Sequence, residues 1–181
     1  SIERRAPSVQ GDLDGIDRTD GTDEIDQIDQ IDETDEVMAS KDKGHYGAKH
    51  SGGVVVANEI SEAVKKRSRQ GALTCPLAFK IAGELTVLPG EVGRAMDILE
   101  INIVKCQLGL FGYSPVRRIV QPAESVSEEL EAALRKAITD GRLPCAEIFR
   151  IAGEFKLAKI RVAAACEKLK IRISACQLGA F

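Results

Sequence analysis

Five cysteines and two histidines are the side chains of this 181-residue chain best suited to bind a metal ion or attack a substrate. Two cysteines occur in nearly identical phrases, CQLGLF at 106–111 and CQLGAF at 176–181, here called the closing phrases; Cys75 and Cys145 are likewise 70 residues apart. These four thiols could form a four-sulfur metal site or a thiol switch. None has Cys-x-x-Cys spacing, and free cysteine commonly packs as a small hydrophobe. The pattern favours buried free thiols, with no metal ion or other cofactor.

His45 and His50 lie in the segment KDKGHYGAKH. No carboxylate or thiol lies close to them in the sequence, so the pair is a weak metal motif. The segment is interpreted as a basic arm at 38–57 that either follows a phosphate backbone or is disordered. No phosphate loop of the GxxxxGK type is present, and the chain from residue 58 onward contains no histidine to act as a base. We therefore expect no enzyme activity.

The net charge of −3 conceals two regions of opposite charge. Residues 1–37 hold 13 acidic residues and three arginines, a balance of −10, whereas the remainder carries +7. The acidic leader has too little apolar content to form a core, which predicts disorder. It is interpreted as a tail that competes with nucleic acid for the basic body, as a solubilising extension, or as upstream sequence preceding a natural start at Met38.

The closing phrases belong to a longer internal repeat. A shift of 70 residues aligns 71–111 with 141–181 without a gap, and 18 of the 41 positions are identical, including the block IAGE at 81–84 and 151–154. A helical pattern precedes each copy, with Asn58 and Ser127 as candidate caps and Gly71 and Gly141 as candidate stops. The chain is therefore predicted to hold two units, at 58–111 and 128–181, joined by a linker at 112–127 that contains Pro115 and Pro122.

Within each unit two short helices are predicted after the first. In the first unit Thr74 can cap one of them, with Pro76 in its first turn, and Pro89 suits the opening turn of the next. Cys166 matches Met96 in the last helix of the two units, so sulfur replaces sulfur at an apolar position. The prediction is a mainly α fold in which the last two helices pack on the first.

Apolar residues recur at the same spacing around two small residues, Ala82 and Ala152. They are Ile81, Leu85, Val87, Val92 and Ala95 in the first unit and Ile151, Phe155, Leu157, Val162 and Ala165 in the second. This spacing resembles that of the helix-turn-helix superfamily. The turn glycine usual in that superfamily is replaced by Thr86 and Lys156. The resemblance implies two tandem three-helix units that form an intramolecular pseudo-dimer and bind DNA through the third helix.

Each unit ends in a short β segment, INIVKCQLGLF or IRISACQLGAF. The side-chain alternation changes parity midway, which predicts a bulge or turn near Val104 and Lys105. A strand or tight hairpin here resembles the wing of winged-helix proteins. Alternatively, the two segments pair with each other and form a sheet shared by both units.

The third helices differ in charge. The first unit shows Glu91, Arg94, Asp97 and Glu100 there, whereas the second shows Lys159, Arg161, Lys168, Lys170 and Arg172 against Glu167. If DNA is bound, the second unit should dominate, with Arg161 as the candidate for base contacts and Lys168, Lys170 and Arg172 nearer the phosphates. Arg94 is the weaker candidate in the first unit. The alternative is that these basic residues form an ordinary solvated surface without a binding role.

These patterns predict a cytoplasmic, DNA-binding transcriptional regulator without a membrane-spanning segment. The alternative function is a protein-protein interaction module of the same fold, which the near-neutral first unit favours. A continuous positive surface would indicate DNA, and an apolar groove a protein partner. The sequence patterns are compatible with a monomer and with a homo-oligomer.

Overall fold

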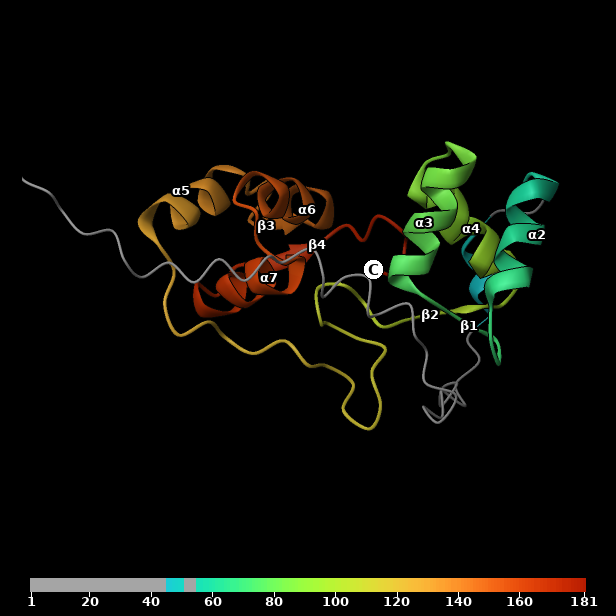
Figure 1. Cartoon of the computed structure of the whole chain (residues 1–181), viewed down its shortest axis with the longest axis horizontal. Helices are drawn as coiled ribbons and strands as arrows, with labels where there is room; N and C mark the ends of the chain where they lie inside the picture. The colour runs from blue at the N-terminus through green and yellow to red at the C-terminus, as the bar shows by residue number, and fades with distance from the viewer. Residues whose placement is uncertain (1–44, 51–54) are drawn as a thin grey trace, which may run out of the picture.

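The computed structural model describes residues 45–50 and 55–181. The predicted acidic leader at 1–37 and residues 38–44 and 51–54 of the arm lie outside the described residues. The protein is mainly helical with short strands, as predicted, and one order of elements occurs twice (Figure 1). The first unit holds α2 (Asn58–Arg67), β1 (Ala72–Thr74), α3 (Cys75–Leu85), α4 (Pro89–Ile98) and β2 (Asn102–Val104). The second holds α5 (Glu128–Lys136), β3 (Arg142–Pro144), α6 (Cys145–Glu154), α7 (Lys159–Lys168) and β4 (Arg172–Ser174).

The predicted starts of α3, α4 and α5 are confirmed. The side chains of Thr74 and Ser127 accept hydrogen bonds from the backbone N–H groups of Leu77 and Leu130, so both are caps. Pro76 and Pro89 lie in the first turns of α3 and α4. The prediction that Asn58 caps α2 is wrong. Asn58 is already the first helical residue, and the cap position is Ala57, which has no side-chain oxygen.

Turn residues at equivalent positions of the two units have a left-handed backbone conformation. Thr86 and Lys156, which replace the expected turn glycine, have φ angles of 54° and 52°, so both adopt a conformation that glycine takes more easily. Gly71 and Gly141 are left-handed too, but they lie in the turns that lead into β1 and β3. The prediction that they stop the first helices is wrong, because α2 and α5 end earlier, at Arg67 and Lys136.

Each unit contains a two-stranded parallel ladder. β2 pairs with β1 and β4 pairs with β3, so the predicted strand after the last helix is present in both units. The alternative in which the two segments pair with each other is wrong, since each finds its partner inside its own unit. β2 and β4 are not hairpin strands, because the partner of each lies before α3 or α6 and runs parallel. Beyond them each closing phrase makes a tight turn, since the N–H groups of Cys106 and Cys176 donate to the carbonyl oxygens of Phe111 and Phe181 at 3.2 and 3.1 Å.

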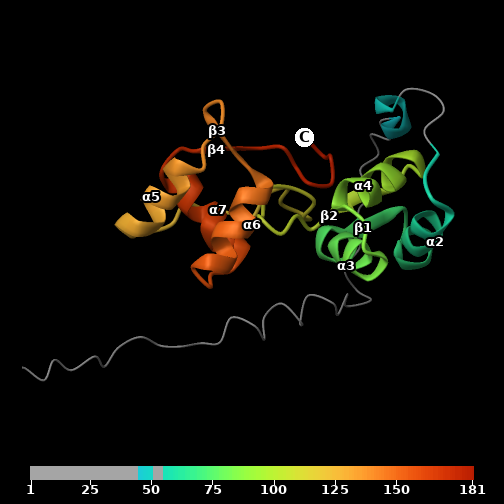
Figure 2. The same cartoon turned by 90° about the horizontal axis from the view of Figure 1, so that it is seen from above.

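The closing phrases cross between the units. The predicted break near Lys105 is confirmed, since Lys105 and its counterpart Ala175 have φ angles of 49° and 50°. Beyond this break Leu108 enters the hydrophobic core of the second unit, and Leu178 enters that of the first. Figures 1 and 2 both show the C-terminal segment leaving β4 and running to α3 and α4. Each unit therefore completes its core with a leucine from the other.

Equivalent residues of the two units contact each other. The ring centroids of Phe79 and Phe149 are 5.0 Å apart, and those of Phe111 and Phe181 are 6.0 Å apart in an edge-on arrangement. Each pair consists of residues 70 positions apart in the sequence. A contact between equivalent residues is the signature of an approximate two-fold axis. We call this axis the pseudo-dyad.

Candidate nucleic-acid interface

Only a narrow stripe of α7 is exposed. Val162, Ala163, Ala165 and Cys166 are buried, which is why the helix is held firmly against its unit. The exposed side chains are those of Arg161 and Lys168. They are seven residues apart, so they share one face and lie about 10 Å apart along the helix axis. The structure thus brings these two predicted DNA contacts onto one surface.

The linker limits access to α7 from the side. The backbone N–H of Ala123 donates to the carbonyl oxygen of Ala164 at 3.0 Å, and Val120 is buried against the second unit. Arg118 of the linker forms an ion pair with Glu167, the acidic side chain of α7. The pair offsets that acidic charge. The linker also reduces the part of the α7 surface that remains available to contact a DNA groove.

Lys159 is separated from the other predicted contacts. Its ammonium nitrogen lies 4.8 Å from the centroid of the Phe149 ring, a cation-π arrangement at the contact between the units. The side chain is half-buried, and burial lowers the pKa of the lysine. Lys159 therefore contributes to the joint between the units rather than to an exposed basic surface.

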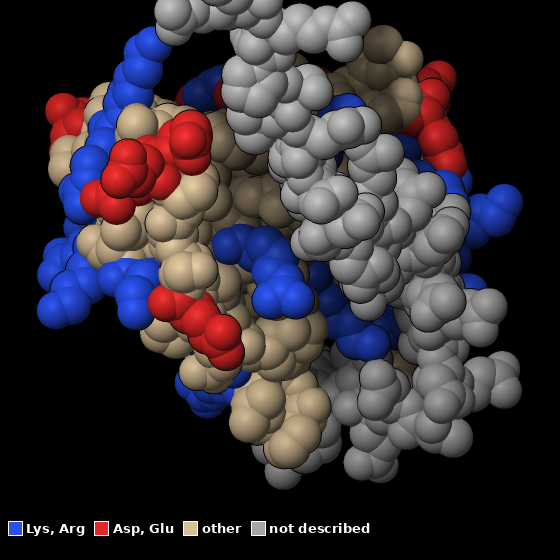
Figure 3. All heavy atoms as spheres, turned by 60° about the vertical axis from the view of Figure 1, so that its left-hand side comes forward, with Lys and Arg blue, Asp and Glu red and all other residues tan. Residues whose placement is uncertain are grey.

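A cluster of four basic residues lies where α7 ends and β4 begins. Arg142 and Arg172 are register partners at the start of β3 and β4, and both are exposed. Lys168 and Lys170 immediately precede this ladder and are exposed as well. We call these four residues the ladder-end cluster. Figure 3, which brings the second unit forward, shows Lys and Arg along one edge, interrupted by groups of Asp and Glu.

The first unit has a different surface at the equivalent positions. Its counterparts of the ladder-end cluster are Ala72, Ile98, Glu100 and Asn102. None is basic, and one is acidic. Two adjacent like charges such as Arg142 and Arg172 destabilise a ladder unless an anion or solvent compensates them. The second unit therefore carries a local concentration of positive charge that folding alone does not require.

The acidic end of α4 holds residues 46–50 of the basic arm. Part of the arm is ordered, because residues 46–49 form a short 3₁₀ helix, η2 (Tyr46–Lys49). The backbone N–H groups of Tyr46 and Gly47 each donate to a carboxylate oxygen of Glu100 at 3.1 Å. Lys49 and His50 contact the Asp97 carboxylate at 3.4 and 3.0 Å. Arg94 stays exposed on α4, outside these contacts.

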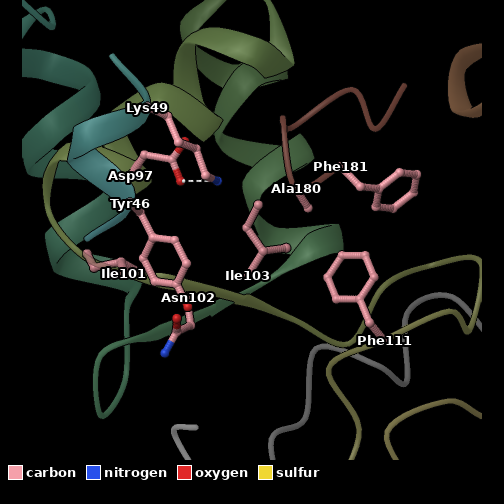
Figure 4. A pocket seen from close by; sticks show the side chains of 9 residues that line it. All are labelled: Tyr46, Lys49, Asp97, Ile101, Asn102, Ile103, Phe111, Ala180 and Phe181. Atoms are coloured by element: carbon pink, nitrogen blue, oxygen red, sulfur yellow. Dashed lines mark hydrogen bonds and ion pairs between the residues drawn. The ribbon is translucent and has the colours of Figure 1, made fainter. Parts of the chain in front are cut away.

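A cavity of about 330 Å³ lies beside the docked arm (Figure 4). Its walls come from η2, α4, β2 and both closing phrases, and they combine apolar and polar side chains: Tyr46, Lys49, Asp97, Ile101, Asn102, Ile103, Phe111, Ala180 and Phe181. The charged pair of Lys49 and Asp97 lies at one end, where the two side chains contact each other. The arm thus forms one wall of a space that the two units share.

The Glu100 contact should make arm docking depend on pH. Hydrogen bonds, first of all from the N–H of Gly47, lower the pKa of the Glu100 carboxyl. A lowered carboxyl pKa means that docking is favoured above the ordinary glutamate pKa and is lost as the pH falls through the lowered value. The Gly47 amide shift, followed by NMR, should therefore titrate with a midpoint below about 4.3, the ordinary glutamate value.

Glu100→Gln should abolish that titration, whereas Glu59→Gln, an exposed change on α2, should leave it intact. A Gly47 amide shift that stays constant through the carboxyl range in the unaltered protein would contradict the docking.

Comparison with protein-family models, curated proteins and solved structures finds no match to this chain. Among the residues that the structure describes, no helix has the length and apolar character needed to cross a bilayer. The structure defines the protein as mainly helical, with two short parallel ladders among the described residues.

Two parts of this surface are not predicted by the sequence patterns. Arg142 is not predicted as a DNA contact, because only the pairing of β3 with β4 places it beside Arg172. The repeat alignment held a signal, since it sets Arg142 against Ala72. The docking of the arm on Asp97 and Glu100 had a weaker signal, the opposite charges of KDKGHYGAKH and α4. Charge alone does not specify which carboxylates a segment will reach.

Proposed function

We propose that this chain is a DNA-binding regulator built from two helix-turn-helix, winged-helix-like units, and that its second unit makes the main contacts. The observation that carries the proposal is the ladder-end cluster, four exposed cations in the second unit at positions where the first unit has none. Exposed Arg and Lys that crowd together are suited to phosphate oxygens, which supply the missing counter-charge. Arg161, on the same face of α7 as Lys168, extends the contact along the helix.

The covered flank of α7 refines how such binding would occur. A helix that lies deep in the major groove needs a broad exposed face. Here the exposed face is narrow, and the linker lies along its side. The proposal is therefore that phosphate contacts by Lys168, Lys170, Arg142 and Arg172 provide most of the affinity, while Arg161 is the side chain that reaches base edges.

Salt-dependent binding measurements test this assignment. The double variant Arg142→Ala/Arg172→Ala should weaken binding to duplex DNA and lower the slope of log K against log salt by about two, one for each lost phosphate contact. Arg161→Ala should weaken binding and relax the sequence preference. Fluorescence anisotropy at several salt concentrations gives both quantities.

The matched control removes the same charge from the first unit. Lys66→Ala/Arg94→Ala deletes two exposed cations there and should change the affinity and slope less. Equal effects of the two double variants would contradict the assignment to the second unit, because they would show that only net charge matters.

The alternative function, a protein-interaction module, is supported by the contacts at the end of α4. The first unit binds a short segment, residues 46–50, through two carboxylates at the end of α4. A unit that holds a basic peptide of its own chain there is suited to hold a similar peptide of another protein. Weak, sequence-independent and salt-labile DNA binding would favour this function over the first.

A further inference from the structure

The cavity beside the docked arm has a charged end and an apolar end (Figure 4). Lys49 and Asp97 lie at the charged end, the rings of Phe111 and Phe181 lie at the other, and Ile103 lies between them. The volume of about 330 Å³ falls at the lower end of the range of about 300–1,000 Å³ that is usual for ligand pockets. Such pockets combine apolar walls with a few polar groups that orient the ligand. The cavity therefore has the size and the walls of a site for a small amphiphilic molecule.

Asp97 gives the charged end a buried negative charge. It is 7% exposed, and no other charged residue that the structure describes is buried. A buried carboxylate is costly unless cations or hydrogen-bond donors compensate it. One of its oxygens contacts the Lys49 ammonium at 3.4 Å, and the other contacts Nε2 of His50 at 3.0 Å. An ionised carboxylate has about four acceptor positions, so Asp97 can accept further donors.

Lys49 is a loosely held partner of Asp97. Its ammonium is 3.4 Å from Oδ1, which is longer than the distance of about 2.7–2.9 Å usual for a charge-assisted hydrogen bond. Its side chain is 45% exposed, against 10% for that of Asp97. A lysine stem that is ordered on the surface also loses rotamer freedom. The Lys49 ammonium can therefore move into solvent at little cost and leave its place at Asp97 to another cation.

Aromatic rings favour an organic cation in this place. The Lys49 ammonium lies 5.2 Å from the centroid of the Tyr46 ring, a cation-π arrangement that another ammonium could adopt. At the apolar end Phe181 is 51% exposed, so part of its apolar surface is uncovered. Aromatic faces attract organic ammonium ions, and a carboxylate adds Coulomb attraction. Asp97 is the only carboxylate among the described residues that line the cavity, so the walls lack the set of oxygen ligands that a metal ion would need.

We propose that this cavity binds a small organic cation, a protonated amine attached to a flat ring system. Its ammonium takes the place of Lys49 at Asp97, over the Tyr46 ring. Its rings lie against Phe111 and Phe181. An anion of the same shape is rejected, because its charge would approach the buried carboxylate. The site is separate from the ladder-end cluster, so ligand binding does not depend on the DNA contacts proposed above.

Titration of the full chain with tryptamine tests the site, because tryptamine is a protonated amine attached to two fused rings. The chain contains no tryptophan, so indole fluorescence comes from the ligand alone. The anisotropy of that fluorescence should rise and saturate at one ligand per chain. Indole-3-propionate has the same rings with a carboxylate in place of the amine, and it should bind at least about tenfold more weakly. Equal affinity for the two probes, or tryptamine binding that does not saturate, would contradict the proposal.

Two substitutions at the ion pair should act in opposite directions. Asp97→Asn should lower the tryptamine affinity about 10–100-fold, because it removes the charge that the ammonium contacts. Lys49→Met should raise the affinity about 2–5-fold, because it removes the competing ammonium and keeps an apolar stem. Glu59→Gln removes an exposed carboxylate of α2 and should leave the affinity unchanged, which distinguishes the site from an effect of net charge.

A third variant keeps the test independent of arm docking. Asp97→Asn also removes two contacts of the arm, whereas Phe181→Ala leaves the ion pair in place and changes only the apolar end. Phe181→Ala should lower the tryptamine affinity about 2–10-fold. Circular dichroism shows whether each variant retains its helices. Unchanged affinity in the helical Asp97→Asn and Phe181→Ala proteins, or binding by helical Lys49→Met that is no tighter than that of the wild type, overturns the proposal.

Discussion

Leu178→Ala should destabilise the first unit, although Leu178 belongs to the second. The side chain is 1% exposed and packs in the core formed by α2, α3 and α4. Truncation of a buried leucine removes its transfer energy and leaves a cavity, so we expect a loss of about 2–5 kcal/mol in the free energy of unfolding. That loss is a large part of the total stability of an ordinary domain. Urea denaturation measures the change.

Hydrogen exchange identifies which unit loses protection. Leu178→Ala should speed exchange in α4 more than in α7, and Leu108→Ala, the matched change in the other closing phrase, should do the reverse. If each variant instead loosened only its own unit, the exchange of closing phrases would be contradicted.

Gly93→Ala should also destabilise the protein strongly. A Cβ at this position on α4 would lie 2.0 Å from the carbonyl oxygen of Leu178, which is backbone and has little room to move. The methyl group must therefore displace the C-terminal segment or α4 itself. Overpacking of this kind costs about 1–3 kcal/mol or more, and here the loss includes contacts of Leu178. Thermal unfolding monitored by circular dichroism measures the effect.

Gly83→Ala is the matched control. Gly83 lies in α3 and is exposed, and a Cβ there would meet nothing within 4 Å. Alanine is the better helix former by about 1 kcal/mol, so this variant should be slightly stabilised. A Gly93→Ala protein as stable as Gly83→Ala would mean that Leu178 does not approach α4 so closely.

Local features of this fold could be predicted from the sequence because they depend on neighbours in the chain. The caps at Thr74 and Ser127 and the prolines of the first turns depend on residues within one turn of helix. The break near Lys105 was visible because strand parity must change when the chain turns from one core to another. The repeat fixed the order of elements in the second unit once the first was known.

Long-range partners could not be predicted in the same way. Leu157 matches the apolar spacing of its unit, yet it is 38% exposed, because spacing identifies a face of a helix and not what covers it. β1 and β3 were missed because strands of three residues give almost no periodicity. Arg142 can be linked to Arg172 only through their pairing. The sequence also does not show that the Lys159 ammonium lies over the Phe149 ring.

The reciprocal placement of Leu108 and Leu178 has a consequence for the history of the chain. Two half-length molecules that exchanged their tails would form a homodimer with the contacts seen here, in which each tail completes the partner's core. Duplication and fusion of the gene would turn that association into an intramolecular one, independent of concentration. Such a fusion would leave the two halves free to diverge. The two units now differ in this way: the second has cations at its ladder, and the first has the carboxylates that hold the arm.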